Sequence, residues 1–446
     1  KDSKLAYTYT PEFFFGLNNN NPQATLFMEP GRNYYWNFNQ LARYERNLGK
    51  TGRHWIGAMV SHEAQEWGYK GTPSMYNMVT KNRSGIPYKG SGALESYLGR
   101  INYSFDDKYI LQAAIRADGS ANFTEENRWG YFPSASVAWR VSKEKFLQDV
   151  TWLNELKLRA EYGATGNPYQ SGIYTAYRPT WTAFDTAYRV GNFGNPDLTW
   201  ELTKTANFGI NLNMFKNRVQ IEADVFDRTT DNLLYRNDGL PAYLGTTGSG
   251  GIGAPIVNFG SLKTRGFAIT LNTVNIDNRA ADFIWRSNFN ISHFKSTIQS
   301  TFAGKPLYST AWWMNDFMGQ SAVGQAPWVF YGYVAEKLFE SVDEINKSAV
   351  PVQSDGVTRL PADETTGVWV GDIKYKDING DGIINEKDQT VIGNPWPKFT
   401  FGFTNSFSYK NFDLSVLVIG TVGNDVYNYM RYNMANPNGV NIGRNL

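Results

Sequence analysis

The chain has 446 residues, of which 15% are aromatic and none is cysteine, so a disulfide-stapled scaffold, a thiolate metal site and a cysteine nucleophile are all excluded. The 43 Lys and Arg residues nearly balance the 41 Asp and Glu residues. The basic residues are scattered along the chain, and the sequence therefore predicts no nucleic-acid surface.

No apolar stretch approaches the roughly 18 to 20 residues that a membrane helix needs. This does not argue against a membrane location, because the strands of a membrane barrel alternate lipid-facing and lumen-facing side chains and so average out as polar. The sequence starts at Lys1 without a signal peptide. For an exported protein we expect the N-terminal part to be missing from this sequence.

Period-two alternation predicts β-strands through most of the chain. Segments 33–48, 54–68, 97–105 and 109–116 come first, and the Asp106-Asp107 turn predicts a hairpin between the last two. Along 97–105 one face is largely aromatic or aliphatic, whereas Leu98, Arg100, Asn102 and Ser104 share the other. Along 109–116, one face has Tyr109, Leu111, Ala113 and Ile115, and the other has Ile110, Gln112, Ala114 and Arg116. Further strands are predicted at 130–141, 154–163, 207–214, 219–225, 263–274, 282–296, 399–410 and 412–418.

These segments number roughly a dozen and run about 9 to 15 residues, whereas 9 to 11 suffice for a tilted strand to cross a membrane. Strands of soluble sandwiches are usually nearer five or six residues. Short turns alternate with long loops. The predicted turns are 106–107, 215–218, 276–281 and 410–412, and the predicted loops are 117–129, 165–204, 230–260, 297–327 and 341–397. The pattern predicts an all-β fold, a transmembrane antiparallel β-barrel with short periplasmic turns and long extracellular loops. Aromatics at strand ends fit interfacial girdles, although the core of a soluble β-protein would also contain them.

Several long strings resemble one family. They are SYLGRINYSFDDKYILQAAIRADGSANF (96–123), NRWGYFPSASVAWRVSKEKF (127–146), LNELKLRAEYGATGN (153–167), NPDLTWELTKTANFGINLNMFKNRVQIEADVFDRTTDNLL (195–234) and GDIKYKDINGDGIINEKDQTVIGNPWPKFTFGFTNSFSYKNFDLSVLVIG (371–420). They resemble the barrel of the SusC/RagA family of TonB-dependent outer-membrane transporters. The resemblance implies a bacterial outer-membrane barrel of 22 strands, an N-terminal plug, a TonB-contacting segment, and a SusD-like lipoprotein over the extracellular face. A dimer of transporter–lipoprotein pairs is a further expected assembly.

This sequence carries no plug, no TonB-contacting segment and too few strands to close such a barrel. We therefore expect residues 1–446 to be part of the barrel domain of a longer transporter, including the extracellular region 341–397.

The segment DINGDGIINEKD has the spacing of a Ca²⁺ loop. The predicted ligands are Asp377, Asn379, Asp381, the Ile383 carbonyl, Asn385 and Asp388. Two features depart from the pattern, since position twelve is Asp rather than Glu and the flanks are not helical. A surface turn rich in Gly, Asp and Asn without an ion is the alternative. Any bound Ca²⁺ would be structural.

The predicted loops contain tryptophans whose flat rings suit stacking on sugars or peptide side chains. The candidates for substrate contact are Trp181, Trp312, Trp313 and Trp328. Packing between loops, or contact with the lipoprotein, is the alternative for each of them.

No arrangement of nucleophile, histidine and acid is visible, so no enzymatic activity is predicted. The leading hypothesis is TonB-dependent uptake of an oligomeric nutrient, either a glycan or a peptide, through a barrel set in outer-membrane lipid. The alternatives are a TonB-dependent siderophore or cofactor receptor, and a soluble all-β adhesin or carbohydrate-binding protein.

Overall fold

The computed structural model describes residues 2–14, 20–49, 52–81, 83–84, 88–168, 172–181, 186–236, 252–310, 317–428 and 430–431. β-strands dominate this part of the chain, as the sequence predicts. None of the helices in it is long and apolar enough to cross a membrane. The chain divides into two compact units. Unit 1 comprises residues 1–148, 157–207 and 230–259, and unit 2 comprises 149–156, 208–229 and 260–446.

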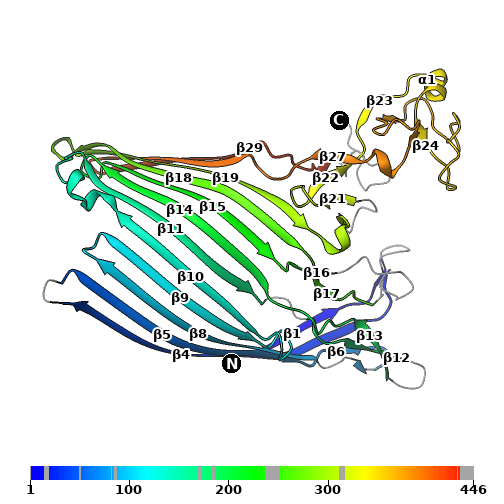
Figure 1. The fold of residues 1–446 in the computed structure, drawn as a ribbon. Helices are drawn as coiled ribbons and strands as arrows, with labels where there is room; N and C mark the ends of the chain where they lie inside the picture. The colour runs from blue at the N-terminus through cyan, green and yellow to red at the C-terminus, as the bar shows by residue number, and fades with distance from the viewer. Residues whose placement is uncertain are drawn as a thin grey trace. The chain divides into compact units, whose positions relative to one another are not determined.

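Unit 1 is built on an antiparallel sheet in which strands that follow one another along the chain mostly lie side by side (Figure 1). Its order is β11-β10-β9-β8-β5-β4-β6-β7, and β1 also pairs with β4. The strands are β1 (Asp2–Thr10), β4 (Thr25–Leu48), β5 (His54–Gly71), β6 (Ser74–Asn77), β7 (Arg83–Ser84), β8 (Tyr88–Phe105), β9 (Tyr109–Ser120), β10 (Trp129–Arg140) and β11 (Leu153–Asn167, in this unit from 157). Short pairs complete the unit: β2 (Phe13–Phe14) with β3 (Asn20–Asn21), β12 (Ala176–Trp181) with β13 (Thr186–Asn192), and β16 (Leu234–Arg236) with β17 (Ile256–Asn258).

The two faces of this sheet differ in chemistry. One face carries apolar side chains that are exposed, among them Val60, Ile101, Ile115 and Val137. Cross-strand partners share a face, so Gly99 lies beside Val60 and Ile115, and Ile101 lies beside Ala58 and Ala113. The opposite face carries Arg100, Asn102 and Gln112, as the alternation predicts. An exposed apolar face is what a lipid-contacting strand requires.

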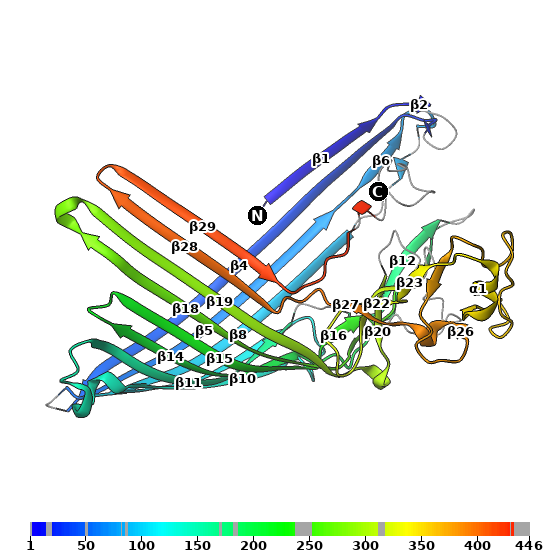
Figure 2. The same ribbon diagram turned by 90° about the horizontal axis from the view of Figure 1, so that it is seen from above.

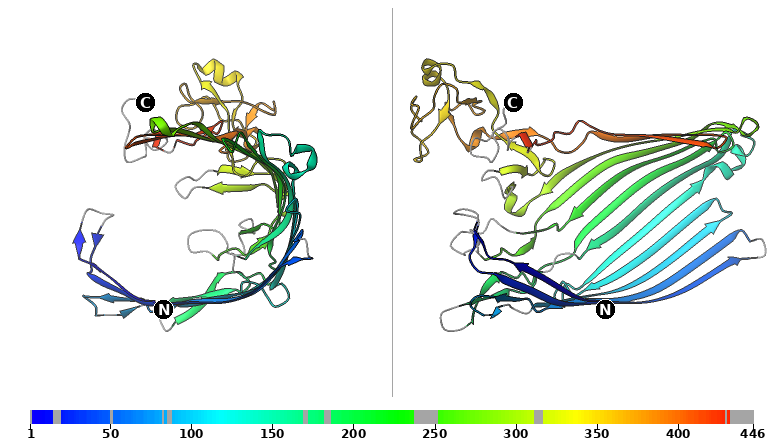
Figure 3. Two further views of the ribbon diagram at one scale, coloured as in Figure 1. Left: turned by 90° about the vertical axis from the view of Figure 1, so that its left-hand side faces the viewer. Right: turned by 180° about the vertical axis from the view of Figure 1, so that it is seen from behind.

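The predicted hairpin at Asp106 and Asp107 is confirmed. Phe105 pairs with Tyr109 across the three-residue connection 106–108. Both aspartates have φ of 52°, the left-handed conformation that the two central residues of a type I′ turn need, and the Lys108 amide donates to the Phe105 carbonyl at 2.9 Å. Leu48 pairs with His54, which pairs with Phe105, so the end of β4, the start of β5 and the β8–β9 turn lie at the same end of unit 1 (Figure 3). The predicted loop 117–129 is confirmed over 121–128, but its first residues are strand: β9 runs to Ser120, and Asp118 pairs with Gly130.

Unit 2 contains a second antiparallel run, in the order β29-β28-β19-β18-β15-β14. Its strands are β14 (Glu201–Met214, in this unit from 208), β15 (Val219–Asp231, in this unit to 229), β18 (Ser261–Asn278), β19 (Phe283–Ser300), β28 (Phe399–Tyr409) and β29 (Phe412–Val422). Within the unit, the turns of β18–β19 and β28–β29 share one end (Figure 2). The predicted turns at 215–218 and 410–412 are confirmed, whereas β18 continues through part of the predicted 276–281 turn.

At the opposite end of unit 2 the long connection from β19 to β28 is folded. It contains β20 (Leu307–Thr310), β21 (Phe317–Ser321), β22 (Val329–Gly332), β23 (Ala335–Leu338), α1 (Val342–Lys347), β24 (Val350–Pro351), β25 (Ile373–Tyr375), β26 (Ile383–Ile384) and β27 (Thr390–Gly393). Residues 335–388, here called the outer lobe, enclose a small core of Phe339, Ile345, Val350 and Val368. Short 3₁₀ helices lie at Val141–Lys143, Lys145–Leu147, Arg279–Ala281, Phe302–Gly304 and Glu386–Asp388.

Candidate functional site

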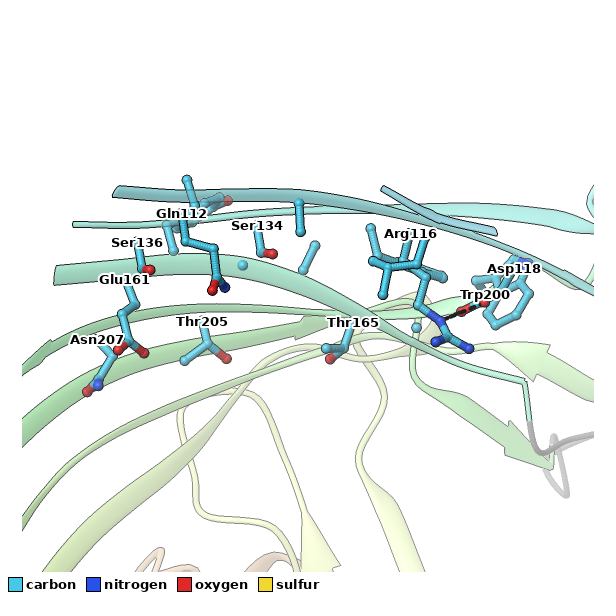
Figure 4. A pocket seen from close by; sticks show the side chains of 18 of the residues that line it. Gln112, Arg116, Asp118, Ser134, Ser136, Glu161, Thr165, Trp200, Thr205 and Asn207 are labelled. Atoms are coloured by element: carbon cyan, nitrogen blue, oxygen red, sulfur yellow. Dashed lines mark hydrogen bonds and ion pairs between the residues drawn. The ribbon is translucent and has the colours of Figure 1, made fainter. Parts of the chain in front are cut away.

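The polar face of unit 1 contains a hollow of about 840 Å³ over β8–β11 and the start of β14 (Figure 4). Its polar lining includes Gln112, Arg116, Asp118, Ser134, Ser136, Glu161, Thr165, Thr205 and Asn207. These side chains point to one side because they occupy alternate positions on neighbouring strands; Ser134, for example, pairs with Ala114 and Gly163. The hollow therefore offers hydroxyl, amide and carboxylate groups along several strands.

Arg116 and Asp118 form the strongest polar contact in this lining. The Arg116 guanidinium donates from Nε to both Asp118 oxygens, at 2.7 and 2.9 Å, and from Nη2 to Ser96 Oγ at 3.0 Å. Both Ser96 and Asp118 are buried. Because the two charges satisfy each other, this end of the hollow is polar but locally neutral.

An aromatic cluster closes the same end of the hollow. Trp200 packs against Phe123 and Phe132, with ring centroids 5.1 and 5.3 Å apart, and Ile173 and Leu198 complete a buried core. The indole Nε1 donates to the Arg128 carbonyl at 3.2 Å, so the buried N–H is satisfied. This core joins strand ends to three loops that are separate in sequence.

Two strand glycines leave room for these rings. A Cβ at Gly166 would lie 2.1 Å from Phe132 Cζ, and a Cβ at Gly130 would lie 2.4 Å from the same atom. Neither glycine has a positive φ, so the backbone conformation does not require glycine at these two positions. Glycine is needed there because the aromatic rings pack directly against the backbone.

Asparagine side chains fasten the loops above this core. Asn258 Nδ2 donates to the Thr199 and Asn232 carbonyls at 2.9 and 3.0 Å, and its Oδ1 accepts from the Thr199 amide. Asn195 Nδ2 donates to the Ile256 carbonyl at 2.9 Å. The described parts of loops 172–200 and 252–260 are thereby held to the strands beside the hollow.

The predicted Ca²⁺ loop lies in the outer lobe. Asp377 accepts from the amides of Gly380 and Gly382 at 2.7 and 2.9 Å, and both glycines have positive φ. The buried Asp388 accepts from the amides of Ile378 and Asn385, each at 2.9 Å. The backbone amides of the loop thus satisfy its own carboxylates.

Burial of the Asp388 carboxyl acts to raise its pKa, but the amides of Asn385, Ile378 and Asn379 together hold that pKa below its usual value. The carboxylate therefore remains ionised. Asn379 Nδ2 donates to Asp381 Oδ2 at 2.9 Å. Among the described residues, no group of three or more acidic or histidine side chains is placed to hold a metal ion. The Ca²⁺ site remains a prediction.

The structure does not test the four predicted substrate tryptophans as one group. Trp312 and Trp313 lie outside the described residues. Trp181 is the last residue of β12 in unit 1, and Trp328 belongs to unit 2, where it is half-buried with a φ of 59°. The Trp328 amide donates to Ser321 Oγ at 2.9 Å. Their role in substrate contact remains a prediction.

Sequence reasoning missed Arg116, Asp118 and Trp200 as neighbours of one hollow. Alternation did indicate that Arg116 belongs to the polar face. It could not show that Asp118 continues the strand, nor that Trp200, from a predicted loop, packs beside Phe132.

Comparison with known proteins gives a consistent result. The family model described as TonB dependent receptor-like, beta-barrel, matches residues 2–441. The chain is 34% identical over 362 residues to TonB-dependent receptor P26 of Formosa agariphila, covering 79% of this chain and 33% of that protein. It is 28% identical over 439 residues to TonB-dependent receptor SusC of Bacteroides thetaiotaomicron, covering 91% of this chain and 40% of that protein.

Among solved structures, the RagAB peptide importer in its closed-closed state is similar, with a TM-score of 0.77 and 21% identity over 98% of this chain and 46% of that chain. At this identity the likeness concerns the fold. The chain spans between a third and two fifths of the length of the curated relatives named above.

Proposed function

The chain belongs to the TonB-dependent receptor family of outer-membrane β-barrels, and on this premise we propose that the complete protein imports an oligomeric nutrient across the outer membrane. The observation that carries the proposal is the contrast between the two faces of unit 1. An exposed apolar face suits lipid, and the opposite face carries a polar hollow of about 840 Å³. The family comprises transporters, so a catalytic role is not proposed.

The chemistry of the hollow favours a glycan or a peptide over a ferric siderophore. Gln112, Ser134 and Ser136 offer neutral donors and acceptors, which match hydroxyl and amide groups. The acidic groups of the lining are paired within the wall: Asp118 with Arg116 at 2.7 Å, and Glu161 with Arg159 at 3.7 Å. A receptor for a compact charged chelate would need unpaired charge directed at it.

We also propose two partners for the complete protein. A SusD-like surface lipoprotein closes the extracellular side, and TonB supplies the energy for release of the substrate. Resemblance to SusC supports both partners, as does the structural likeness to the RagAB importer. Purification of the full-length protein in mild detergent should recover the lipoprotein in a constant ratio. Its consistent absence would contradict the first partner.

Uptake is tested with the full-length gene in cells that lack the native copy. Ser136→Trp fills the hollow, whereas the matched Val137→Trp lies on the apolar face. Uptake of fluorescent oligosaccharides or oligopeptides should fall about tenfold for Ser136→Trp, because the indole ring occupies space that the substrate would use. A tenfold change corresponds to about 1.4 kcal/mol of binding free energy. Uptake by Val137→Trp should stay within twofold of native. Iron-limited growth that depends on the protein, without any oligomer uptake, would favour the siderophore alternative.

A structural Ca²⁺ ion in the 377–388 loop is a second proposal. Its support is the oxygen spacing, together with the positive φ of Gly382 at the sixth position. Calorimetry on the full-length protein should detect millimolar or tighter Ca²⁺ binding that Asp381→Ala abolishes and Asp355→Ala, in the same lobe but outside the loop, preserves. No heat at millimolar Ca²⁺ would contradict the site.

A further inference from the structure

Three basic residues lie side by side across the apolar face of unit 1. Arg32 on β4 pairs directly with Lys70 on β5, and Lys70 pairs directly with Lys89 on β8. Cross-strand partners project from the same face with Cβ atoms about 5 Å apart, and like charges placed in this way destabilise a sheet. All three side chains are exposed. A bound counter-charge would relieve the repulsion within these three residues, here called the basic row.

The protein does not supply that counter-charge within its described part. None of the three makes an ion pair or a side-chain hydrogen bond with another described residue. The nearby Glu66 is engaged elsewhere, since it accepts from Tyr34 Oη at 2.7 Å and from Trp36 Nε1 at 3.1 Å. The positive charge of the basic row is therefore available to a ligand.

A hollow of about 690 Å³ adjoins the basic row, and its lining includes Arg32, Lys70 and Lys89 together with Tyr34, Glu66 and Ser91. Two residues before Lys70 on the same face of β5, Gly68 pairs with Tyr34 and with Ser91. Gly68 and Ser91 are small, which leaves space for the hollow. The Tyr34 ring lies over Gly68, where a Cβ would be 2.3 Å from Tyr34 Cε1. The ligand thus meets cations on one side and an aromatic ring with a hydroxyl on the other.

The distance of the basic row from the turn ends of the strands indicates its depth relative to the membrane. Sixteen positions separate Lys70 from His54, the residue at the turn end of β5. At about 3.3 Å per residue and a tilt of about 40°, this is roughly 40 Å along the membrane normal. The apolar band of an outer-membrane barrel is only about 25 Å tall. The row therefore lies above the hydrocarbon, among polar headgroups, and on the same face as the lipid-contacting Val60 and Ile101.

We propose that the basic row binds the phosphate groups of an anionic, phosphorylated glycolipid in the outer leaflet. A guanidinium and two ammonium groups can surround a phosphate, with Arg32 binding two of its oxygens at once and the lysines acting as point charges. Tyr34 and Trp36 lie below the basic row, where aromatic side chains anchor a barrel at the interface. The proposed nutrient path lies on the opposite face, so this site does not depend on which nutrient is carried.

The test uses the full-length transporter in detergent micelles with a phosphorylated lipid A as the probe, and native mass spectrometry or fluorescence as the readout. The triple variant Arg32→Gln/Lys70→Gln/Lys89→Gln removes the row. A control, Lys145→Gln/Lys216→Gln/Lys410→Gln, removes the same charge from exposed lysines at the turn ends of other strands. We expect at least tenfold weaker binding for the row variant and less than a twofold change for the control. Equal binding by both variants would overturn the proposal.

Two further arms identify the source of the phosphate. The dephosphorylated glycolipid should bind the native protein at least tenfold more weakly, and inorganic phosphate at equal phosphate concentration should not displace lipid A. Displacement by inorganic phosphate would overturn the lipid assignment. Lys70→Arg should retain binding, which separates loss of charge from misfolding, and the heat-dependent gel shift of folded barrels checks the fold of each variant. Nutrient uptake by the row variant should stay within twofold of native, so this proposal and the proposed transport can fail separately.

Discussion

The membrane strands β8–β10 and the outer lobe use the same apolar residue types in opposite ways. On β9, Ile115 is 54% exposed and its neighbours on that face are also apolar. In the lobe, Ile345 is 1% exposed and packs with Phe339, Val350 and Val368. The lobe has the core of a small water-soluble fold, whereas the strands have an apolar exterior.

The difference shows where each region obtains its stability. The lobe buries apolar surface within itself, so substitution in its core should cost what it costs in a soluble protein. The strands are stabilised by contact between their apolar face and lipid. A charged substitution on that face should lower the free energy of unfolding only when the protein is in a bilayer. Four predictions test this contrast, ordered from the largest expected effect to the smallest.

The lobe core is tested by Ile345→Ala. Removal of this buried side chain should destabilise the lobe by about 2–5 kcal/mol, because a cavity remains among Phe339 and Val350. Limited proteolysis of the full-length protein should show faster cleavage within 335–388, while the heat-dependent gel shift of the barrel is unchanged. Loss of the barrel signal along with the lobe would break the contrast.

The lipid-facing strand is tested by Ile115→Arg, with Ala114→Arg on the opposite face as its control. Arginine at 115 should cost about 2–4 kcal/mol of folded stability in phospholipid vesicles, because the charge would enter hydrocarbon near the membrane centre. Arginine at 114 should have much less effect, since Ala114 lines the polar hollow. Equal destabilisation of both variants, measured by chemical denaturation, would mean that the faces are assigned wrongly.

The aromatic cluster beside the hollow is tested by Gly166→Ala. The added methyl would lie against Phe132 and Trp200 and should cost about 1–3 kcal/mol through overpacking. Gly99→Ala is the matched control, because a Cβ there meets no atom within 4 Å. Hydrogen exchange of the loop amides in 121–128 should rise only in the first variant. If both behave alike, the rings are not tightly packed.

The smallest expected effect concerns pH in the lobe. Amides and hydroxyls of Thr366 and Thr365 donate to Asp363 and lower its pKa to about 2. Because the folded pKa lies below the unfolded value, the contribution of Asp363 to stability is present above about pH 4 and lost as pH falls towards 2. Proteolytic stability of the lobe should decline over this interval, and Asp363→Asn should flatten that decline. An unchanged profile in the variant would contradict the assignment.

Alternation along the strands was sufficient to predict much of the fold. The hairpin 399–410/412–418 is confirmed as β28 and β29, with Tyr409 paired to Phe412, because aromatic and small polar residues alternate there without interruption. The two faces of β9 were also predicted correctly from residues such as Ile115 and Arg116. The transporter family followed from the strings at 96–146 and 371–420, and the family match confirms it.

Features that depend on register or on loop packing could not be predicted. Arg32, Lys70 and Lys89 are far apart in sequence, and only the pairing of β4, β5 and β8 brings them into one row. The outer lobe was predicted only as a loop, because its strands of two to four residues are too short for a period to be visible. Trp200 lay in a predicted loop, so its packing against Phe132 had no sequence signal.

The central claim, that the strands cross the membrane with one face towards lipid and the other towards a polar interior, is tested most directly along β9. This chain contains no cysteine, so single cysteines at positions 111–116 can be labelled in the full-length protein in vesicles. Positions 112, 114 and 116 should react with a water-soluble maleimide, and positions 111, 113 and 115 should resist it while responding to a lipid-dissolved quencher. Reactivity that does not alternate along the strand would contradict the claim.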